Sequence, residues 1–509
     1  MKIDKKRFIP AILTIVIVLV LVSFNLDIVK SNVDKVYNFM SHKFSWLFIS
    51  ANIAAFIFSL WIIFGPYKKV KLGDEKPKYS TFSWIAMMFT TSCSAGLIVF
   101  GFIESIIYSA NPPFGLEPLS IEAYEMAQSY SHYHWGLNAW TLYVPITIAL
   151  GIILYNKKEK NINISSACEP VLKKHSKGIL GVLVDVFGIF GAVVAPVTSM
   201  GLGMPLLTLL FQNIFSISDD KVIFLQIGIL LIWILMFGAS VYKGLDKGIK
   251  KLSDINVISA FAFMLLVACF AGISYVFSAE INTIGHYIIN LPRMITNTDP
   301  YGTGDFVANW TVWYWAWLIV YMPLMGVFNA KISKGRTLRE VVLGQMVFCS
   351  LGCWVAMSTL GNYAIKIQQS GILDIAKVLD TSGQPAAIVE IIKTMPFPTV
   401  IMIVVAILCF IFMATTVDSS SFVAAETTYK HEKNGDDLAP RWLRMLWAIV
   451  TCVITFVLLQ VGGFDAVQVL AILIGFPLAI IMFIVIISAI KSSGFSYRGL
   501  SVVTTVKSA

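Results

Sequence analysis

Residues 308–330 read ANWTVWYWAWLIVYMPLMGVFNA, and this run of 23 residues contains no charged side chain. A helix needs about 20 apolar residues to cross the roughly 30 Å hydrocarbon core of a bilayer. The run therefore predicts a transmembrane helix. Its composition is unusual, because four tryptophans (Trp310, Trp313, Trp315 and Trp317) crowd into its first half.

The rest of the chain has a similar character. Of its 509 residues, 57% are hydrophobic and only 13% are charged, whereas about 25% are charged in a soluble domain. So few charges cannot cover the surface of a soluble protein of this size, and we expect a polytopic membrane protein. The net charge of +9 does not indicate nucleic-acid binding, because the basic residues lie in short loops between apolar runs.

Twelve apolar runs are long enough to be transmembrane helices. They cover about residues 9–25, 45–64, 83–108, 138–155, 180–209, 222–240, 254–279, 308–330, 341–362, 397–424, 443–461 and 466–490. A shorter apolar stretch, 281–295, is predicted to be an interfacial helix. The sequence therefore predicts an all-α membrane protein with twelve transmembrane helices.

Lysines and arginines indicate the orientation of these spans. They follow the even-numbered spans, at 68–78, 157–160, 243–251 and 331–339, whereas the long loop 109–134 has none. Cytoplasmic loops carry the excess of basic residues. We expect the even-numbered loops and both termini to be cytoplasmic, in the cell (inner) membrane.

Polar residues interrupt two other spans. Span 83–108 contains the small polar stretch 90–94, and span 397–424 contains Asp418 among hydroxyl residues. Polar groups at this depth usually face a bundle interior or a pathway. Spans 3 and 8 each open a block of five, which fits an inverted repeat with interrupted helices. We expect two peripheral helices within 1–80, repeats at 81–295 (including the interfacial helix) and 296–491, and a short cytoplasmic tail at 492–509.

Aromatic residues share one face of the helix predicted at 308–330. These are Trp310, Trp313, Tyr314, Trp317 and Tyr321, whose spacing follows the helical period. A second cluster, Trp135, Trp140 and Tyr143, opens the fourth span. Ring faces attract a trimethylammonium group by about 0.5–2 kcal/mol each. The alternative is helix packing with an interfacial aromatic belt, but the second cluster favours a binding site.

Several segments resemble the betaine/choline/carnitine transporter family. The likeness extends over essentially the whole chain and rests on Trp310–Leu318, Asn329–Glu340, His134-Trp135-Gly136, Asn111–Pro118, Gly65-Pro66-Tyr67 and Leu291–Met294. The resemblance implies a LeuT-type inverted repeat, over spans 3–7 and 8–12 with two extra N-terminal helices. It also implies an often homotrimeric transporter that carries quaternary-ammonium zwitterions by sodium symport, proton symport or substrate/product antiport.

The resemblance also implies which residues bind the substrate. The aromatic positions of the family's pathway fall on Trp135, Trp140, Tyr143, Trp310, Tyr314, Trp315, Trp317, Tyr321 and Phe328. Among them we expect Trp135, Trp317 and Tyr321 to form the ammonium cage. The chain departs from the family at Leu318, where a second adjacent tryptophan is usual, and at Ile107, where carnitine/butyrobetaine antiporters tend to carry a tyrosine.

A sodium site is implied at the polar interruptions. Thr415 and Thr416 fall where sodium-coupled members place a hydroxyl pair, and backbone carbonyls at Thr90 and Cys93 would complete the site. The alternative is that both hydroxyls bond back to their own helix. Na⁺ is thus the only coupling ion or cofactor expected.

Three features bear on the choice between symport and antiport. Sodium-independent antiporters carry an arginine near the position of Asn256, so its absence favours sodium. In contrast, Met325 stands where those antiporters use a thioether in place of sodium, near the substrate carboxylate. Ala192 and Pro196 replace hydroxyls of a second sodium position.

The sequence therefore predicts a secondary active transporter for glycine betaine or a close analogue, driven by sodium symport. The alternative is sodium-independent antiport of carnitine/butyrobetaine or choline-like solutes. Its expected partners are the solute and the lipid bilayer, without nucleic acid. A membrane-bound enzyme is disfavoured because no catalytic dyad is recognisable. For Glu104 and Asp418, a proton relay and structural hydrogen bonding both remain open.

Overall fold

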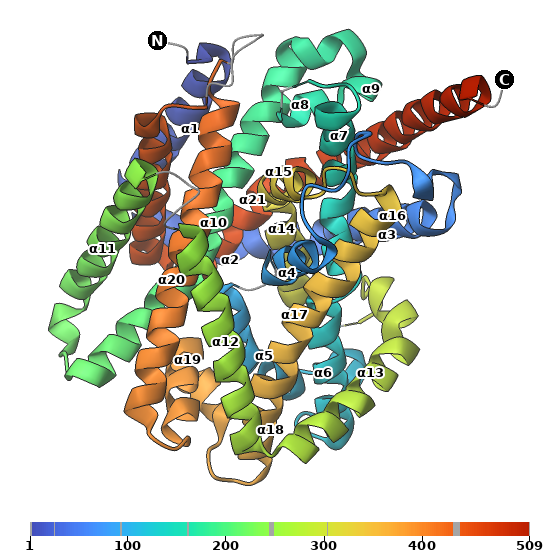
Figure 1. Ribbon diagram of the computed structural model, residues 1–509. Coiled ribbons are helices and arrows are strands. Elements are labelled where there is room, and N and C mark those ends of the chain that lie inside the picture. The colour runs from blue at the N-terminus through green and yellow to red at the C-terminus, as the bar shows by residue number, and fades with distance from the viewer. Residues whose placement is uncertain are drawn as a thin grey trace.

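The structure of this chain, a computed structural model, describes residues 3–24, 26–91, 94–159, 162–243, 249–302, 304–430 and 438–507. Helices make up most of these residues (Figure 1). Within these ranges there is no β-strand, only isolated bridges between Ile3 and Tyr429 and between Lys71 and Thr337. The prediction of an all-α protein is therefore confirmed.

Each predicted span coincides with a helix or with helices in succession. In chain order these are α1 (Lys5–Phe24), α3 (Ser45–Phe64), α4 (Thr81–Thr91) with α5 (Ala95–Ala110), α7 (Val144–Tyr155), α10 (Ile179–Phe215), α11 (Val222–Lys243), α12 (Ile249–Ala271), α14 (Trp313–Val320) with α15 (Met322–Ile332), α16 (Leu338–Leu343) with α17 (Cys349–Ala356) and α18 (Asn362–Gln369), α20 (Pro398–Thr427) and α21 (Arg441–Lys507).

Fewer helices than the twelve predicted spans are, by length and composition, able to cross a membrane as a single helix. In the described part of the chain, seven helices are long and apolar enough to do so, and nine are if each bent pair counts as one span. One of the seven, α21, covers two predicted spans, which meet at a non-helical break at Gly462 and Gly463. The total of twelve stays a prediction.

Two spans are interrupted midway, and each is the first span of a predicted repeat. Helices α14 and α15 meet at an angle of 56° around Tyr321, and Pro323 lies in the first turn of α15, where a missing N–H is tolerated. Between α4 and α5, residues 92–93 lie outside the described residues. Ser94 caps α5, because its hydroxyl accepts a hydrogen bond from Leu97 N at 3.2 Å.

Some helices differ from the prediction. α12 ends at Ala271, and Gly272, with a φ of +97°, turns the chain by 101° into α13 (Ile273–Ile295). The seventh span is therefore shorter, and the interfacial helix longer, than expected. The loop predicted at 109–134 contains the buried helix α6 (Ile121–His134). Four further helices were also not predicted: α2 (Leu26–Lys43), the short α8 (Ile164–Ala167) and α9 (Glu169–Leu172), and α19 (Ile375–Lys393).

The loops after the even-numbered spans lie close together. Leu72 N donates to Arg336 O at 2.9 Å, which joins the loops after the second and eighth spans. Tyr155 Oη donates to Lys331 O at 3.2 Å, and Asp4 N donates to Thr428 O at 2.9 Å. The start of α1 and the end of α21 lie at the same end of the molecule (Figure 1). The basic loops after the second, fourth and eighth spans therefore share one side, as the charge pattern predicts, whereas residues 244–248 of the loop after the sixth span lie outside the described residues.

Helix α10 runs through the middle of the bundle and packs against α20, α21 and α14. It comes close to the backbone of α14 at Gly191. A Cβ atom on this residue would lie 2.8 Å from Val320 O and 3.3 Å from Pro323 Cγ. The glycine therefore lets α10 touch the backbone of α14 directly beside the bend.

Gly191→Ala is expected to lower the thermal unfolding midpoint of the detergent-solubilised protein. The backbone of α14 must move to admit the methyl group, and overpacking costs about 1–3 kcal/mol. The matched control is Gly228→Ala in α11, where a Cβ would meet nothing within 4 Å. Alanine is the better helix former there by about 1 kcal/mol. Equal midpoints for the two variants would contradict this packing.

Candidate functional site

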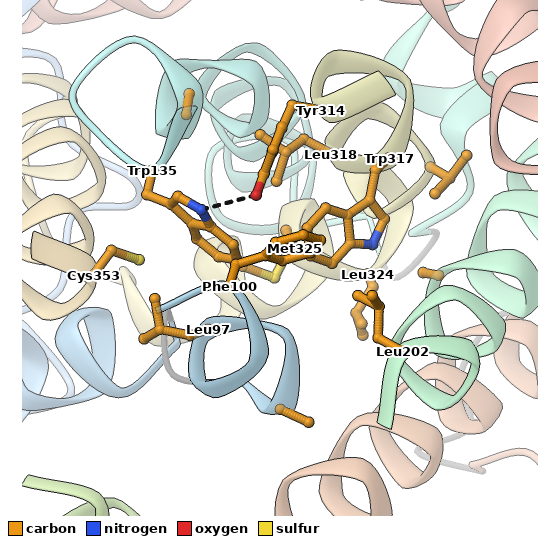
Figure 2. Close-up of a cluster of buried hydrophobic side chains, with 14 of the residues drawn as sticks. Leu97, Phe100, Trp135, Leu202, Tyr314, Trp317, Leu318, Leu324, Met325 and Cys353 are labelled. Carbon is orange, nitrogen blue, oxygen red and sulfur yellow. Dashed lines mark hydrogen bonds between the residues drawn. The ribbon is translucent and has the colours of Figure 1, made fainter. Parts of the chain in front are cut away.

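A buried cluster of aromatic rings surrounds α14 (Figure 2). The rings of Trp313 and Trp317 stack with centroids 5.0 Å apart. Trp317 also meets Trp135 edge to face at 5.6 Å and Tyr314 at 5.7 Å. In Figure 2, Trp135 and Trp317 lie on either side of Phe100 and Met325. The two aromatic groups predicted from separate spans therefore form one cluster.

One face of α5 supports this cluster through Gly96, Phe100, Glu104 and Tyr108, which recur at every fourth residue. The Phe100 ring lies within 6.5 Å of five other rings, those of Trp135, Trp310, Trp313, Tyr314 and Trp317. A Cβ on Gly96 would lie 2.9 Å from Trp317 Cη2, so the glycine admits the indole. Sequence reasoning missed Gly96, Phe100 and Tyr108, although the spacing of four was the available signal.

Helix α10 supports the cluster from another side through two hydroxyls. Trp317 Nε1 donates to Thr198 Oγ1 at 2.7 Å. The hydroxyls of Ser199 and Tyr321 lie 2.5 Å apart and share a hydrogen bond. These contacts fix the last turn of α14 and the residue at the bend. Thr198 and Ser199 were not predicted from the sequence.

Glu104 joins three elements at the far side of the rings. Its Oε2 accepts hydrogen bonds from Trp135 Nε1 at 2.9 Å and from Tyr314 Oη at 2.6 Å. The Glu104 side chain is fully buried. His134 stacks on Tyr314 with ring centroids 4.5 Å apart. The carboxylate therefore holds two ring edges in a fixed orientation, which accords with the structural hydrogen bonding left open above.

The other predicted pathway residues extend from this cluster. Trp140 Nε1 donates to Trp135 O at 3.0 Å, and its ring lies 5.8 Å from Tyr143. Trp310 packs on Tyr108 at 5.2 Å. All of these side chains except Trp310 are buried, and Trp310 is partly buried.

Three further predicted residues differ in their surroundings. Met325 is buried in the cluster (Figure 2). Trp315 turns toward Tyr133, with ring centroids 5.3 Å apart. Phe328 is 38% exposed, so it lies outside the buried cluster.

The predicted sodium ligands are described only in part. Thr415 Oγ1 and Thr416 Oγ1 both donate to Phe412 O at 2.9 Å, so both hydroxyls bond to their own helix. Each hydroxyl oxygen still has lone pairs that can accept a cation. The side chain of Thr90 and all of Cys93 lie outside the described residues. Hydroxyl and carbonyl oxygens are ligands suited to a hard cation such as Na⁺.

The family model for betaine/carnitine/choline family transporters matches residues 7–496. The chain belongs to this family. As a member of the betaine/carnitine/choline family, it is a multi-pass membrane transporter for small quaternary-ammonium solutes, and it is not an enzyme. This agrees with the apolar helices and with the aromatic cluster at the interrupted span.

Thr198→Val is expected to weaken substrate binding by this betaine/carnitine/choline transporter. The substitution keeps the side-chain shape but leaves Trp317 Nε1 without its acceptor, which costs about 1–3 kcal/mol. If about 1 kcal/mol of that cost falls on binding, the KM for uptake rises roughly fivefold. The matched control is Thr208→Val on the same helix, because Thr208 Oγ1 donates to Met204 O of its own helix. An unchanged KM in Thr198→Val would show that this hydrogen bond does not set the ring position.

Proposed function

We propose that this transporter moves a betaine-type quaternary-ammonium compound, glycine betaine or a close analogue, by sodium symport. The observation that supports this most strongly is the contact between Trp135 and Trp317. The two residues come from different predicted repeats, and their rings meet at 5.6 Å beside the interrupted helices. Sites at such interruptions are typical of inverted-repeat transporters.

The chemistry of the cluster suits a trimethylammonium group. Such a group cannot donate an ordinary hydrogen bond, but ring faces attract it by about 0.5–2 kcal/mol each. Several rings can thus replace its hydration without a salt bridge that would slow release. Trp135, Tyr314, Trp317 and Tyr321 are the proposed cage, with Met325 beside the substrate carboxylate. Trp140, Tyr143, Trp310 and Phe328 are proposed to line the pathway that leads to the cage.

The basic loops support an orientation in the cell (inner) membrane. Lys71, Lys331 and Arg336 belong to segments that contact one another on one side of the molecule. Because basic loops are retained in the cytoplasm, we propose that this side and both termini are cytoplasmic.

A second candidate mechanism is sodium-independent antiport of carnitine/butyrobetaine or choline-like solutes. Two observations favour it. Met325 lies within the aromatic cluster, where its thioether is close to the proposed substrate site. The hydroxyls of Thr415 and Thr416 each make a hydrogen bond to Phe412 O, so they have partners in the absence of sodium.

Uptake of labelled glycine betaine into proteoliposomes separates the two mechanisms. We expect accumulation with an inward sodium gradient and none when potassium replaces sodium. Uptake without sodium that requires vesicles preloaded with substrate would instead support the antiporter. Failure to transport glycine betaine in either condition, together with uptake of carnitine or choline, would identify the other solute class.

A double substitution tests the proposed sodium ligands. Thr415→Ala with Thr416→Ala is expected to raise the sodium concentration for half-maximal uptake about tenfold or more, because it removes two oxygen ligands at about 1.4 kcal/mol or more in total. The control is Thr427→Ala on the same helix, since Thr427 Oγ1 also donates to its own helix, at Val423 O. If both variants shift the sodium dependence equally, the two threonines are not ligands.

A further inference from the structure

We propose that Glu104 gives the aromatic cage its preference for a positive charge. It does so as a positioning residue, because it orients and polarises Trp135 and Tyr314 rather than touching the solute. This inference rests on the proposed function of these rings as the substrate cage. It assigns a specific role to a buried carboxylate that the transport mechanism described above does not use.

The hydrogen bonds of Glu104 converge on a single atom. Trp135 Nε1 and Tyr314 Oη both donate to Oε2, at 2.9 and 2.6 Å, and they are 3.2 Å from each other (Figure 2). Trp135 caps the end of α6, Tyr314 lies on α14 and Glu104 on α5. One carboxylate oxygen therefore joins three elements and sets the angle between two rings of the cage.

The charge of this carboxylate has little compensation from nearby cations. Within the described residues, the one cationic or titratable nitrogen within 4.0 Å is His134 Nδ1, which is 3.8 Å from Oε1. That nitrogen is also 2.8 Å from Tyr108 Oη, and His134 Nε2 is 3.1 Å from Thr311 Oγ1. Oε1 itself accepts no hydrogen bond from the described part of the chain. A buried carboxylate that lacks a full countercharge is costly, and a cationic solute in the adjacent cage would lower this cost.

The two donors also transmit the charge to the ring faces. When a ring N–H or O–H donates to an anion, the bond is charge-assisted and strong, and it polarises the donor group. The shift of electron density toward the ring makes its face more negative. Since the attraction of a cation depends on that negative face, Glu104 strengthens the hold of both rings on an ammonium group.

The test compares two solutes of nearly equal shape. Glycine betaine carries a trimethylammonium group, and 3,3-dimethylbutanoate replaces its nitrogen with carbon, which keeps the carboxylate and removes the positive charge. Binding of each to the purified full-length protein is measured by tryptophan fluorescence. The wild type is expected to prefer glycine betaine. In Glu104→Gln, which keeps an acceptor oxygen but loses the charge, the preference is expected to fall roughly 2- to 30-fold, mainly through weaker binding of glycine betaine.

Two further variants test the same inference without relying on Glu104→Gln. Glu104→Asp restores the charge and is expected to recover part of the preference. Tyr314→Phe keeps the charge and the ring but removes one donor, so its preference should fall by less than that of Glu104→Gln. If Glu104→Gln does not fold, as judged by size-exclusion chromatography, Tyr314→Phe decides, and an unchanged preference in it would overturn the proposal.

The outcomes separate this inference from the function on which it rests. If Glu104→Gln weakens both solutes by the same factor, Glu104 is structural only and the inference is wrong. If the wild type itself binds the two solutes equally, the rings do not select a cation, and the proposed cage fails before Glu104 is considered.

Discussion

A helix that is interrupted inside a bilayer must have its polar groups satisfied by other parts of the protein, because hydrocarbon offers no partners. At the bend around Tyr321 the backbone finds partners within its own span, since Tyr321 N donates to Leu318 O and Met325 N donates to Tyr321 O, and α10 supplies the partners of the buried side chains. Ser199 bonds to the Tyr321 hydroxyl and Thr198 to the Trp317 indole, while Gly191 brings the backbones of α10 and α14 together. Since α10 also packs on α20 and α21, the bend is connected through α10 to two helices of the predicted second repeat. The contacts of α10 with α14 therefore help to fix the positions of the aromatic rings, in addition to the contacts between the rings.

The opposite wall of the cluster depends on the period of α5. Residues four apart lie on one face of a helix, so Gly96, Phe100, Glu104 and Tyr108 all turn toward α14 and the end of α6. Their contributions differ, since the glycine admits an indole, the phenylalanine fills the centre, the carboxylate accepts two ring donors, and the tyrosine bonds to His134. If the helix register slipped by one residue, all four contacts would be lost together. In this interrupted span, α5, the half that follows the break, therefore positions the side chains that contact the aromatic cluster.

The sequence predicted the features that a bilayer imposes. Apolar length indicated where the spans lie, and the polar residues 90–94 indicated the interruption near Ser94. The polar residues around Asp418 do not break their span, because α20 is continuous there. The eighth span stood out by its tryptophans and not by polar residues. Helix α6 was missed because its composition is mixed, although Ser120 carries the N-cap signal. Thr198 and Ser199 could not be separated from Thr208 by sequence, since a hydroxyl in a helix usually bonds to its own backbone. Only the packing of α10 against α14 reveals which hydroxyls act between helices.

The balance of charge in the site bears on how the proposed symport is coupled. A zwitterionic solute brings a carboxylate as well as an ammonium group, and the roles proposed for the rings and for Glu104 concern only the ammonium. A fixed arginine would neutralise the carboxylate in every state, but Asn256, which the family resemblance matches to such an arginine, donates to Leu408 O at 3.3 Å and carries no charge. A sodium ion near Thr415 and Thr416 would supply positive charge only while it is bound. Solute and ion would then each favour the binding of the other, and in the proposed symport this reciprocal coupling would let a sodium gradient drive accumulation of the solute.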